Sequence, residues 1–150
     1  WIGGLATADA ACTSAAQMAG LASEHPFKAW LATSTDSDPY SRMDRTFEGY
    51  YVLTTGDVIA VSWSGLADGL LLHALDRDES GAQVSGQQVW TNTAATGKVA
   101  SAQTDCTDWT SASVNLTGYT GNTDAVNDDW TAQQTLNCDK TAHIYCFEDP

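Results

Sequence analysis

Four cysteines constrain this chain more than any other feature, and they stand at positions 12, 106, 138 and 146 of 150 residues. No two of them form a C-x-x-C pair, so the spacing argues against a zinc cluster. Four cysteines without metal-ligand spacing favour two disulfides over free thiols. Because disulfides persist in oxidising compartments, we expect a secreted, extracellular protein or one displayed at the cell surface.

Length and charge exclude several classes of protein. A chain of 150 residues with 43% hydrophobic residues is expected to form a single domain, residues 1–150, with a real core. The net charge of −13, with only six Lys and Arg, leaves no cationic surface for nucleic acid or heparin. Apolar runs are too short for membrane insertion. The chain opens at Trp1 without the basic region of a signal peptide.

The segment after Gly4 has the pattern of a helix with one thin apolar face. Thr7 is the expected N-cap, since its hydroxyl can accept from an amide of the first turn. Asp9 adds negative charge near the positive end of the helix dipole. Gly20 is expected to end the helix in a left-handed conformation. Small residues recur at three- and four-residue steps: Ala8, Ala11, Cys12, Ala15, Ala16 and Ala19.

The remaining chain predicts short strands separated by polar loops. A hairpin is expected at 50–61, because two apolar runs flank Gly56, which supplies the positive φ of a tight turn. Segment 91–141 is rich in Thr, Ser, Asn, Asp and Gly, which indicates long ordered loops with little regular structure. The other expected elements are a strand at 27–31, a loop at 33–45, a short helix from Ser62 to Ala67, a buried strand at 70–75, and strands at 89–91 and 143–147.

Several short motifs occur in order along nearly the whole chain. They are Gly4-Leu-Ala-x-Ala-Asp-Ala-x-Cys12, Gly20-Leu21, Phe27-x-Ala-Trp-Leu31, Val89-Trp90, Cys106-x-x-Trp109 and Tyr145-Cys146. Together they resemble the endostatin-like domain, known from the C-terminal parts of collagens XV and XVIII and from bacterial surface proteins. The resemblance implies an α+β, C-type-lectin-like fold with long ordered loops. It also implies that the first cysteine pairs with the last and the second with the third, which gives Cys12–Cys146 and Cys106–Cys138.

The chain departs from that family where the family binds ligands. Animal endostatins carry an arginine-rich heparin surface and N-terminal histidines for zinc, whereas this chain is acidic and begins Trp1-Ile-Gly-Gly. Neither the heparin surface nor the zinc site is therefore transferred. The sugar-binding calcium motifs of true C-type lectins are also absent from the sequence, since Asn127-Asp-Asp-Trp130 has a different order.

One segment has part of a calcium-loop pattern. Asp76, Asp78 and Ser80 take its first, third and fifth positions and Gly81 its sixth. Gln87, however, stands where a bidentate Glu normally closes such a loop. The alternative is a polar turn with surface acids, which the missing Glu favours. Two further acid clusters, Asp124 with Asp128 and Asp129 and Asp105 with Asp108, are weaker candidates for calcium, and no other cofactor is expected.

Aromatic residues outside the motifs are candidates for contact with a partner, by stacking on sugar rings or by entering a protein interface. These candidates are Trp1, Trp130, Tyr40 and Tyr119, with burial in the core as the alternative. Core packing is expected for Trp30, Trp63, Trp90 and Trp109. Asn115 begins an Asn-Leu-Thr glycosylation sequon, which matters in a host that glycosylates secreted proteins.

The sequence does not pair a nucleophile with a base. It contains no G-x-S-x-G elbow, P-loop or dinucleotide glycine pattern, and its three histidines are far apart. The leading hypothesis is therefore a non-enzymatic binding or adhesion module that recognises a protein, matrix or glycan partner. The second hypothesis is a structural subunit whose copies assemble into an extracellular filament, tube or coat. The third is an enzyme on the same scaffold.

Overall fold

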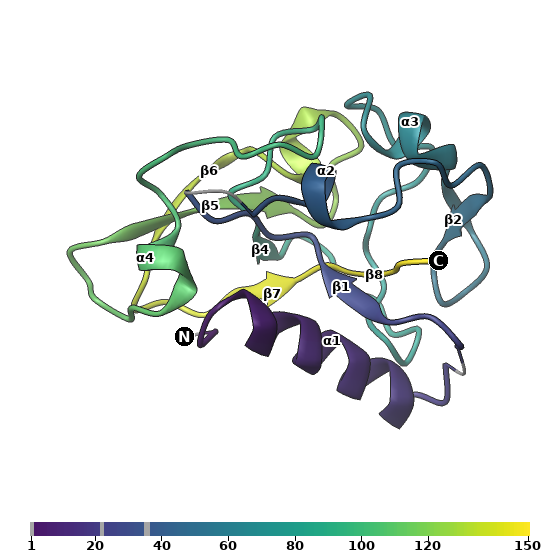
Figure 1. The fold of residues 1–150 in the computed structure, drawn as a ribbon, viewed down its shortest axis with the longest axis horizontal. Helices are drawn as coiled ribbons and strands as arrows, with labels where there is room; N and C mark the ends of the chain where they lie inside the picture. Colours follow the sequence, from purple (N-terminus) through teal and green to yellow (C-terminus); the bar gives the residue numbers. More distant parts are fainter. Residues whose placement is uncertain (1, 22, 35–36) are drawn as a thin grey trace.

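Residues 2–21, 23–34 and 37–150 are described by the computed structural model, which has an α+β fold with several small sheets (Figure 1). The elements in chain order are α1 (Leu5–Met18), β1 (Phe27–Ala29), α2 (Pro39–Arg42), β2 (Tyr50–Val52), β3 (Val58–Val61), α3 (Ser62–Leu66), β4 (Gln88–Trp90), α4 (Cys106–Trp109), β5 (Thr117–Asn122), the 3-10 turn η1 (Asp128–Trp130), β6 (Gln134–Asn137), β7 (His143–Ile144) and β8 (Cys146–Glu148).

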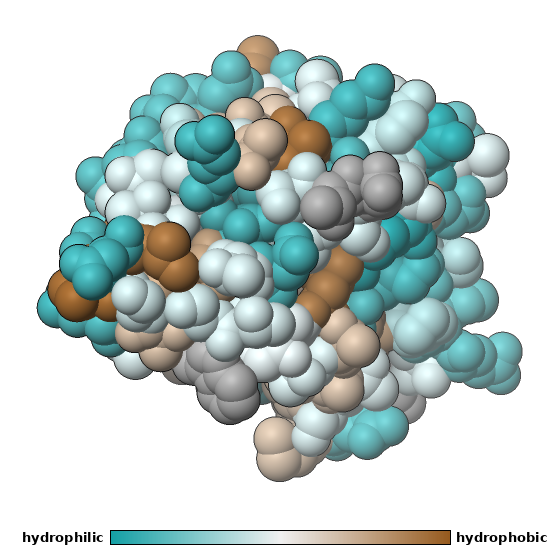
Figure 2. Space-filling model, turned by 60° about the vertical axis from the view of Figure 1, so that its left-hand side comes forward, coloured by the Kyte–Doolittle hydropathy of each residue, from teal (hydrophilic) through white to brown (hydrophobic). Residues whose placement is uncertain are grey.

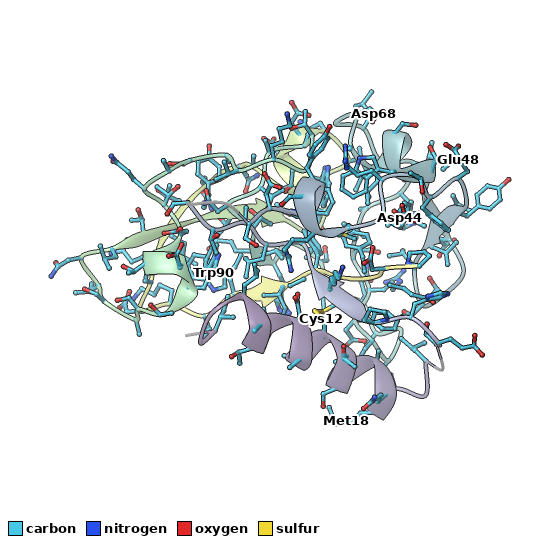
Figure 3. All side chains as sticks on the ribbon, viewed as in Figure 1. Cys12, Met18, Asp44, Glu48, Asp68 and Trp90 are labelled. Atoms are coloured by element: carbon cyan, nitrogen blue, oxygen red, sulfur yellow. A yellow bond between two sulfur atoms is a disulfide. The ribbon has the colours of Figure 1, made fainter. Side chains whose placement is uncertain are left out.

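Helix α1 starts earlier than the sequence predicts. It begins at Leu5, and the expected N-cap at Thr7 is wrong, because the Thr7 hydroxyl donates to the Gly3 carbonyl oxygen at 2.9 Å from inside the first turn. In Figure 3 the Cys12 side chain points from the helix toward the strands above it. The apolar face is as narrow as predicted, and its buried residues are Ala8, Cys12 and Ala16.

The end of α1 is the one that the sequence predicts. Gly20 has a φ of 72°, and its amide donates to the Gln17 carbonyl oxygen at 3.1 Å. The amide of Leu21 donates to the Ala16 carbonyl oxygen at 2.9 Å. This pair of bonds is the Schellman motif, which satisfies carbonyl groups of the last turn. Met18 projects away from the body of the protein beside this end (Figure 3).

The C-terminal segment was expected to form one strand at 143–147, but it divides into two. β7 pairs in parallel with β4, whereas β8 pairs antiparallel with β1. Tyr145 lies between them and is buried. The two disulfides are Cys12–Cys146, which ties α1 to β8, and Cys106–Cys138, as the resemblance implies.

The prediction of long loops over 91–141 is wrong for two strands of the largest sheet, which has the order β6-β5-β4-β7. Glycines inside β5 suggested a loop, but large neighbours explain them. A Cβ at Gly118 would lie 2.7 Å from a ring carbon of Trp90, and a Cβ at Gly121 would lie 1.9 Å from the Trp130 carbonyl oxygen. These glycines therefore let the strand approach two tryptophans.

The apolar run at 70–75 is irregular rather than a buried strand. Leu71 is buried, whereas Leu70 and Leu72 are 67% and 68% exposed. The Leu71 amide donates to the Val126 carbonyl oxygen and the Leu72 amide to the Ile59 carbonyl oxygen, each at 2.8 Å. The run therefore covers the outer edge of β3 without forming a sheet strand.

Local signals account for the elements between residues 37 and 61. The predicted hairpin is confirmed as β2 and β3, which pair antiparallel. The expected loop over 33–45 contains α2, which was not predicted. The Asp38 carboxylate accepts from the Ser41 amide at 2.8 Å and caps this helix.

Tryptophans form the centre of the main hydrophobic cluster. The Trp30 ring centroid lies 5.7 Å from that of Trp63 and 5.0 Å from that of Trp130. Trp130 is fully buried, which corrects its candidacy as a surface anchor. Trp90 and Trp109 pack at 5.6 Å in a second cluster beside Cys106–Cys138. No helix in the described ranges is long and apolar enough to cross a membrane.

Candidate functional site

A groove of about 710 Å³ opens between α1, β8 and the β2–β3 hairpin. Its helix wall is the C-terminal half of α1, and residues from 75 to 84 contribute to a further side. Figure 1 shows the hairpin and the C-terminal strand meeting at one end of the molecule. A concave site of this size, with aromatic walls and a few polar groups, is the usual form of a ligand site.

The aromatic wall of the groove is built around Tyr51. Its ring packs edge-on against Phe147 and Phe47, with centroid distances of 5.8 and 5.1 Å. Burial first, and then the charges of Asp149 and Asp44, raise the pKa of Tyr51 to about 12. At neutral pH the hydroxyl therefore stays protonated and can donate a hydrogen bond.

A second tyrosine of the groove, Tyr145, has a hydroxyl that makes no hydrogen bond in the described part of the chain. Tyr145 is 7% exposed and packs against Trp130 at 5.6 Å between ring centroids. Burial, and secondarily the charge of Asp124, raises the pKa of Tyr145 well above its usual value, so this group is neutral.

The groove has an acidic rim. Asp78, Glu79 and Glu148 line it, whereas its one arginine, Arg77, lies 3.8 Å from the Asp76 carboxylate. The Ser23 hydroxyl donates to Glu148 across the groove wall. The rim therefore favours a ligand with positive charge.

The segment with part of a calcium-loop pattern is a turn closed by its own hydrogen bonds. One oxygen of Asp78 accepts from the Ser80 amide and hydroxyl and from the Ala82 amide, at 2.7 to 2.9 Å. The Ser80 hydroxyl, then the turn amides, hold the pKa of Asp78 below its usual value. Asp76 is buried and accepts from Gln83 at 3.3 Å. The described residues include no group of three His, Cys, Asp or Glu that could hold a metal.

The acidic pair Asp105 and Asp108 lies outside the groove, since Asp105 is the N-cap residue of α4 and Asp108 lies within it. Cys106 to Trp109 all have positive φ, between 50° and 63°, so α4 is a left-handed turn. Asp105 is buried and accepts from the Ser34 amide at 2.6 Å. Burial, then the hydrogen bond and charge of Asp105, raise the pKa of Asp108.

The Tyr40 ring contacts the two cationic side chains that have no carboxylate partner in the described ranges. The Arg45 guanidinium carbon lies 4.3 Å and the Lys98 nitrogen 4.7 Å from its ring centroid. The other four cations each pair with an aspartate. Two cation–π contacts explain Tyr40 as part of a surface cluster, away from the groove lining.

The other residues predicted as site residues do not lie together in one site. Tyr119 is half-buried in β5, opposite Thr135, and does not line the groove. Asn115 is exposed, and its amide donates to the Ser113 hydroxyl at 3.2 Å. Trp1 lies outside the described residues. The face turned forward in Figure 2 is largely hydrophilic, with apolar residues in small separate patches.

Sequence reasoning missed the groove and its rim. The hairpin was predicted, but no local signal tells that Tyr50, Val52 and Glu148 would face one cavity. The pairing partners of a strand, and the edges left open, depend on segments distant in sequence. No family model and no curated protein matches this chain.

Proposed function

We propose that this protein is a non-enzymatic, extracellular binding module of C-type-lectin-like fold, which recognises a protein partner through the groove beside β2. The observation that carries the proposal is the groove of about 710 Å³ with its aromatic wall and acidic rim. The two disulfides support an oxidising location. The endostatin-like motifs support the fold.

The side chains that line the groove suit ligand binding better than catalysis. The Ser23 hydroxyl contacts a carboxylate, Glu148, rather than an imidazole that could take its proton. Asp78 is engaged by its own turn, and Tyr145 is neutral and buried. A serine hydroxyl that donates to an imidazole is the usual signature of covalent catalysis by serine, and the described lining residues show no hydrogen bond of that kind.

A protein partner fits the groove better than a glycan. Tyr51 and Phe147 are each 6% exposed, and their rings pack edge-on against each other. They therefore offer little exposed ring face on which a sugar could stack. The acidic rim also opposes acidic glycans. Apolar side chains of a partner can pack against the aromatic wall of the groove, and its cationic side chains can pair with the acidic rim.

Self-assembly is the second candidate function. Its support is the exposed apolar surface on the hairpin and beside it, at Tyr50, Val52, Leu70 and Leu72. The charge of −13 on every copy works against close association of copies. Sizing of the purified protein over a range of concentration and salt distinguishes the two functions.

The experiment uses one groove variant and one matched control. Ala15 lines the groove, and Ser14 next to it is exposed on α1. We expect ligands selected from a displayed peptide library to bind Ala15→Trp about tenfold more weakly or worse, and Ser14→Trp like the wild type. Selected ligands that bind both variants equally, or hits on a glycan array alone, would overturn the proposal.

A further inference from the structure

One strand of the groove wall has an unpaired edge. Among the described residues, β2 belongs to a two-stranded sheet in which its single partner is β3. The Ser62 amide donates to the Gly49 carbonyl oxygen at 2.7 Å, and the Leu53 amide to the Asp57 carbonyl oxygen at 2.8 Å. Backbone groups alternate in direction along a strand, so those of Tyr50 and Val52 point away from β3.

These outward backbone groups are available. No hydrogen bond in the described part of the chain engages the N–H or C=O of Tyr50 or Val52 on that side. Their side chains are 66% and 53% exposed. The opposite edge of the hairpin is different, because the Leu72 amide covers it through the Ile59 carbonyl oxygen.

The groove lies along this edge. Tyr50 and Val52 on one face of β2, and Tyr51 and Leu53 on the other, all line it. A strand that presents its edge, rather than one face, contributes side chains of both faces. Natural edge strands are commonly protected by Lys or Pro, and the sequence from Glu48 to Leu53 has neither.

Charge indicates what the edge can accept. Glu48 projects outward beside one end of β2 in Figure 3. Asp78 and Glu79 lie near the other end of the strand, where the Thr54 hydroxyl donates to the Asp78 carbonyl oxygen at 2.9 Å. Glu148 lines the groove from β8. Acids therefore flank the open edge, with Arg77 as the opposing charge.

We propose that β2 binds an extended, positively charged segment of a partner protein as an added strand, with the partner's backbone on Tyr50 and Val52. This inference rests on the proposed function and names the partner's chemistry at the same groove. Main-chain hydrogen bonds supply affinity in such β-augmentation, and side chains on alternate positions supply specificity. A second copy of this chain is the weaker occupant, because each copy brings a charge of −13 to the edge.

The test uses a synthetic peptide of about seven residues, one strand in length, with alternating Lys and Val. Binding is followed by the amide shifts of Tyr50 and Val52 in the nitrogen-15 labelled protein. Val52→Pro removes an outward N–H without removing a bond to β3, and Val52→Thr is the matched control that keeps it. Both variants change the Val52 side chain but only one removes the N–H, so we expect binding to Val52→Pro to be about tenfold weaker than binding to Val52→Thr.

A second measurement needs no variant. The peptide is methylated on the backbone nitrogens of its odd or its even residues, and only one alternate set of an added strand faces β2. We expect one methylated peptide to lose binding about tenfold and the other to bind normally. Equal binding of both peptides to the wild type would overturn the added strand, even if Val52→Pro failed to fold.

Two outcomes separate this inference from the proposed function. If library-selected ligands lose affinity for Ala15→Trp but bind Val52→Pro normally, the edge inference fails and the groove function stands. If ligands bind Ala15→Trp normally, the groove function fails as well. Concentration-dependent growth in size that Val52→Pro abolishes would show that a second copy is the occupant, which also overturns the proposal.

Discussion

The carboxylate of Asp9 and the guanidinium of Arg42 meet at 2.9 Å and connect three elements, α1, β1 and α2. The second oxygen of Asp9 accepts from the Ala29 amide at 2.9 Å. The Arg42 guanidinium also donates to the Ala29 carbonyl oxygen at 2.7 Å. Asp9 was expected only to favour the helix dipole, but it also fixes β1 against the helix.

Replacing Asp9 should therefore destabilise the fold. Asp9→Ala leaves Arg42 without its carboxylate and removes the acceptor of the Ala29 amide. We expect a loss of about 2 kcal/mol, the range for hydrogen bonds to charged groups. Urea denaturation measures it, with Asp139→Ala as the control, since the exposed pair of Asp139 with Lys140 should contribute less than about 0.5 kcal/mol. Equal losses from the two variants would contradict this prediction.

Trp130 should behave as a core residue. It is fully buried against Trp30 and Tyr145, so Trp130→Ala should cost about 3–5 kcal/mol of unfolding free energy. Tyr50→Ala, at a side chain that is 66% exposed, should change stability by no more than about 0.5 kcal/mol. Thermal and urea unfolding of both variants test the contrast. A stable Trp130→Ala protein would refute the burial.

Local signals predicted the elements whose cause is local. The end of α1 follows from Gly20, and the hairpin follows from the turn at Gly56. Trp130 could not be placed in the same way, because its burial depends on Trp30, one hundred residues earlier. The strand at 117–122 was missed because its glycines serve close packing on tryptophans rather than a turn.

The unpaired edge of β2 could not be predicted from the sequence, for a related reason. Residues 70–72 cover the far edge of β3, and nothing in their composition says which strand they will meet. The disulfide pairing came from the resemblance, since four cysteines alone allow three connectivities. Cys12–Cys146 and Cys106–Cys138 are the pairs that the structure contains.

The two disulfides should differ in their contribution. Cys12–Cys146 closes a separation of 134 residues and Cys106–Cys138 one of 32. The chain-entropy model gives about 5 kcal/mol for the longer loop and about 4 kcal/mol for the shorter. Paired Cys→Ala variants of each bridge, unfolded in urea, measure both losses. A larger loss from the shorter loop would show that native contacts, rather than chain entropy, decide the order.

Calcium should leave the stability of the turn at Asp76, Asp78 and Ser80 unchanged. The Asp78 carboxylate is already used by the amides and hydroxyl of its own turn, and position twelve is Gln87. We expect no change of melting temperature at about 1 mM calcium, a concentration at which extracellular calcium modules bind. A rise that disappears in Asp78→Asn would instead establish a calcium site in this turn.

The pair Asp105 and Asp108 should make stability depend on pH in the direction opposite to most carboxylates. Burial and the neighbouring Asp105 raise the pKa of Asp108 in the folded protein. Between the ordinary carboxyl pKa and this raised value, the folded state binds more protons than the unfolded state. Stability should therefore fall as pH rises through that window.

Asp108→Asn isolates this effect. Asn is uncharged, so the free energy of unfolding of the variant minus that of the wild type should grow as pH rises through the window and level off at neutral pH. Asn also tolerates the left-handed backbone at this position, which adds an offset that does not depend on pH. The slope, rather than the offset, is thus the readout of the acid pair. Urea unfolding from about pH 3 to pH 7 measures it, with Asp139→Asn as the control. A difference that stays flat across this range would mean that the pKa of Asp108 is not raised in the folded protein.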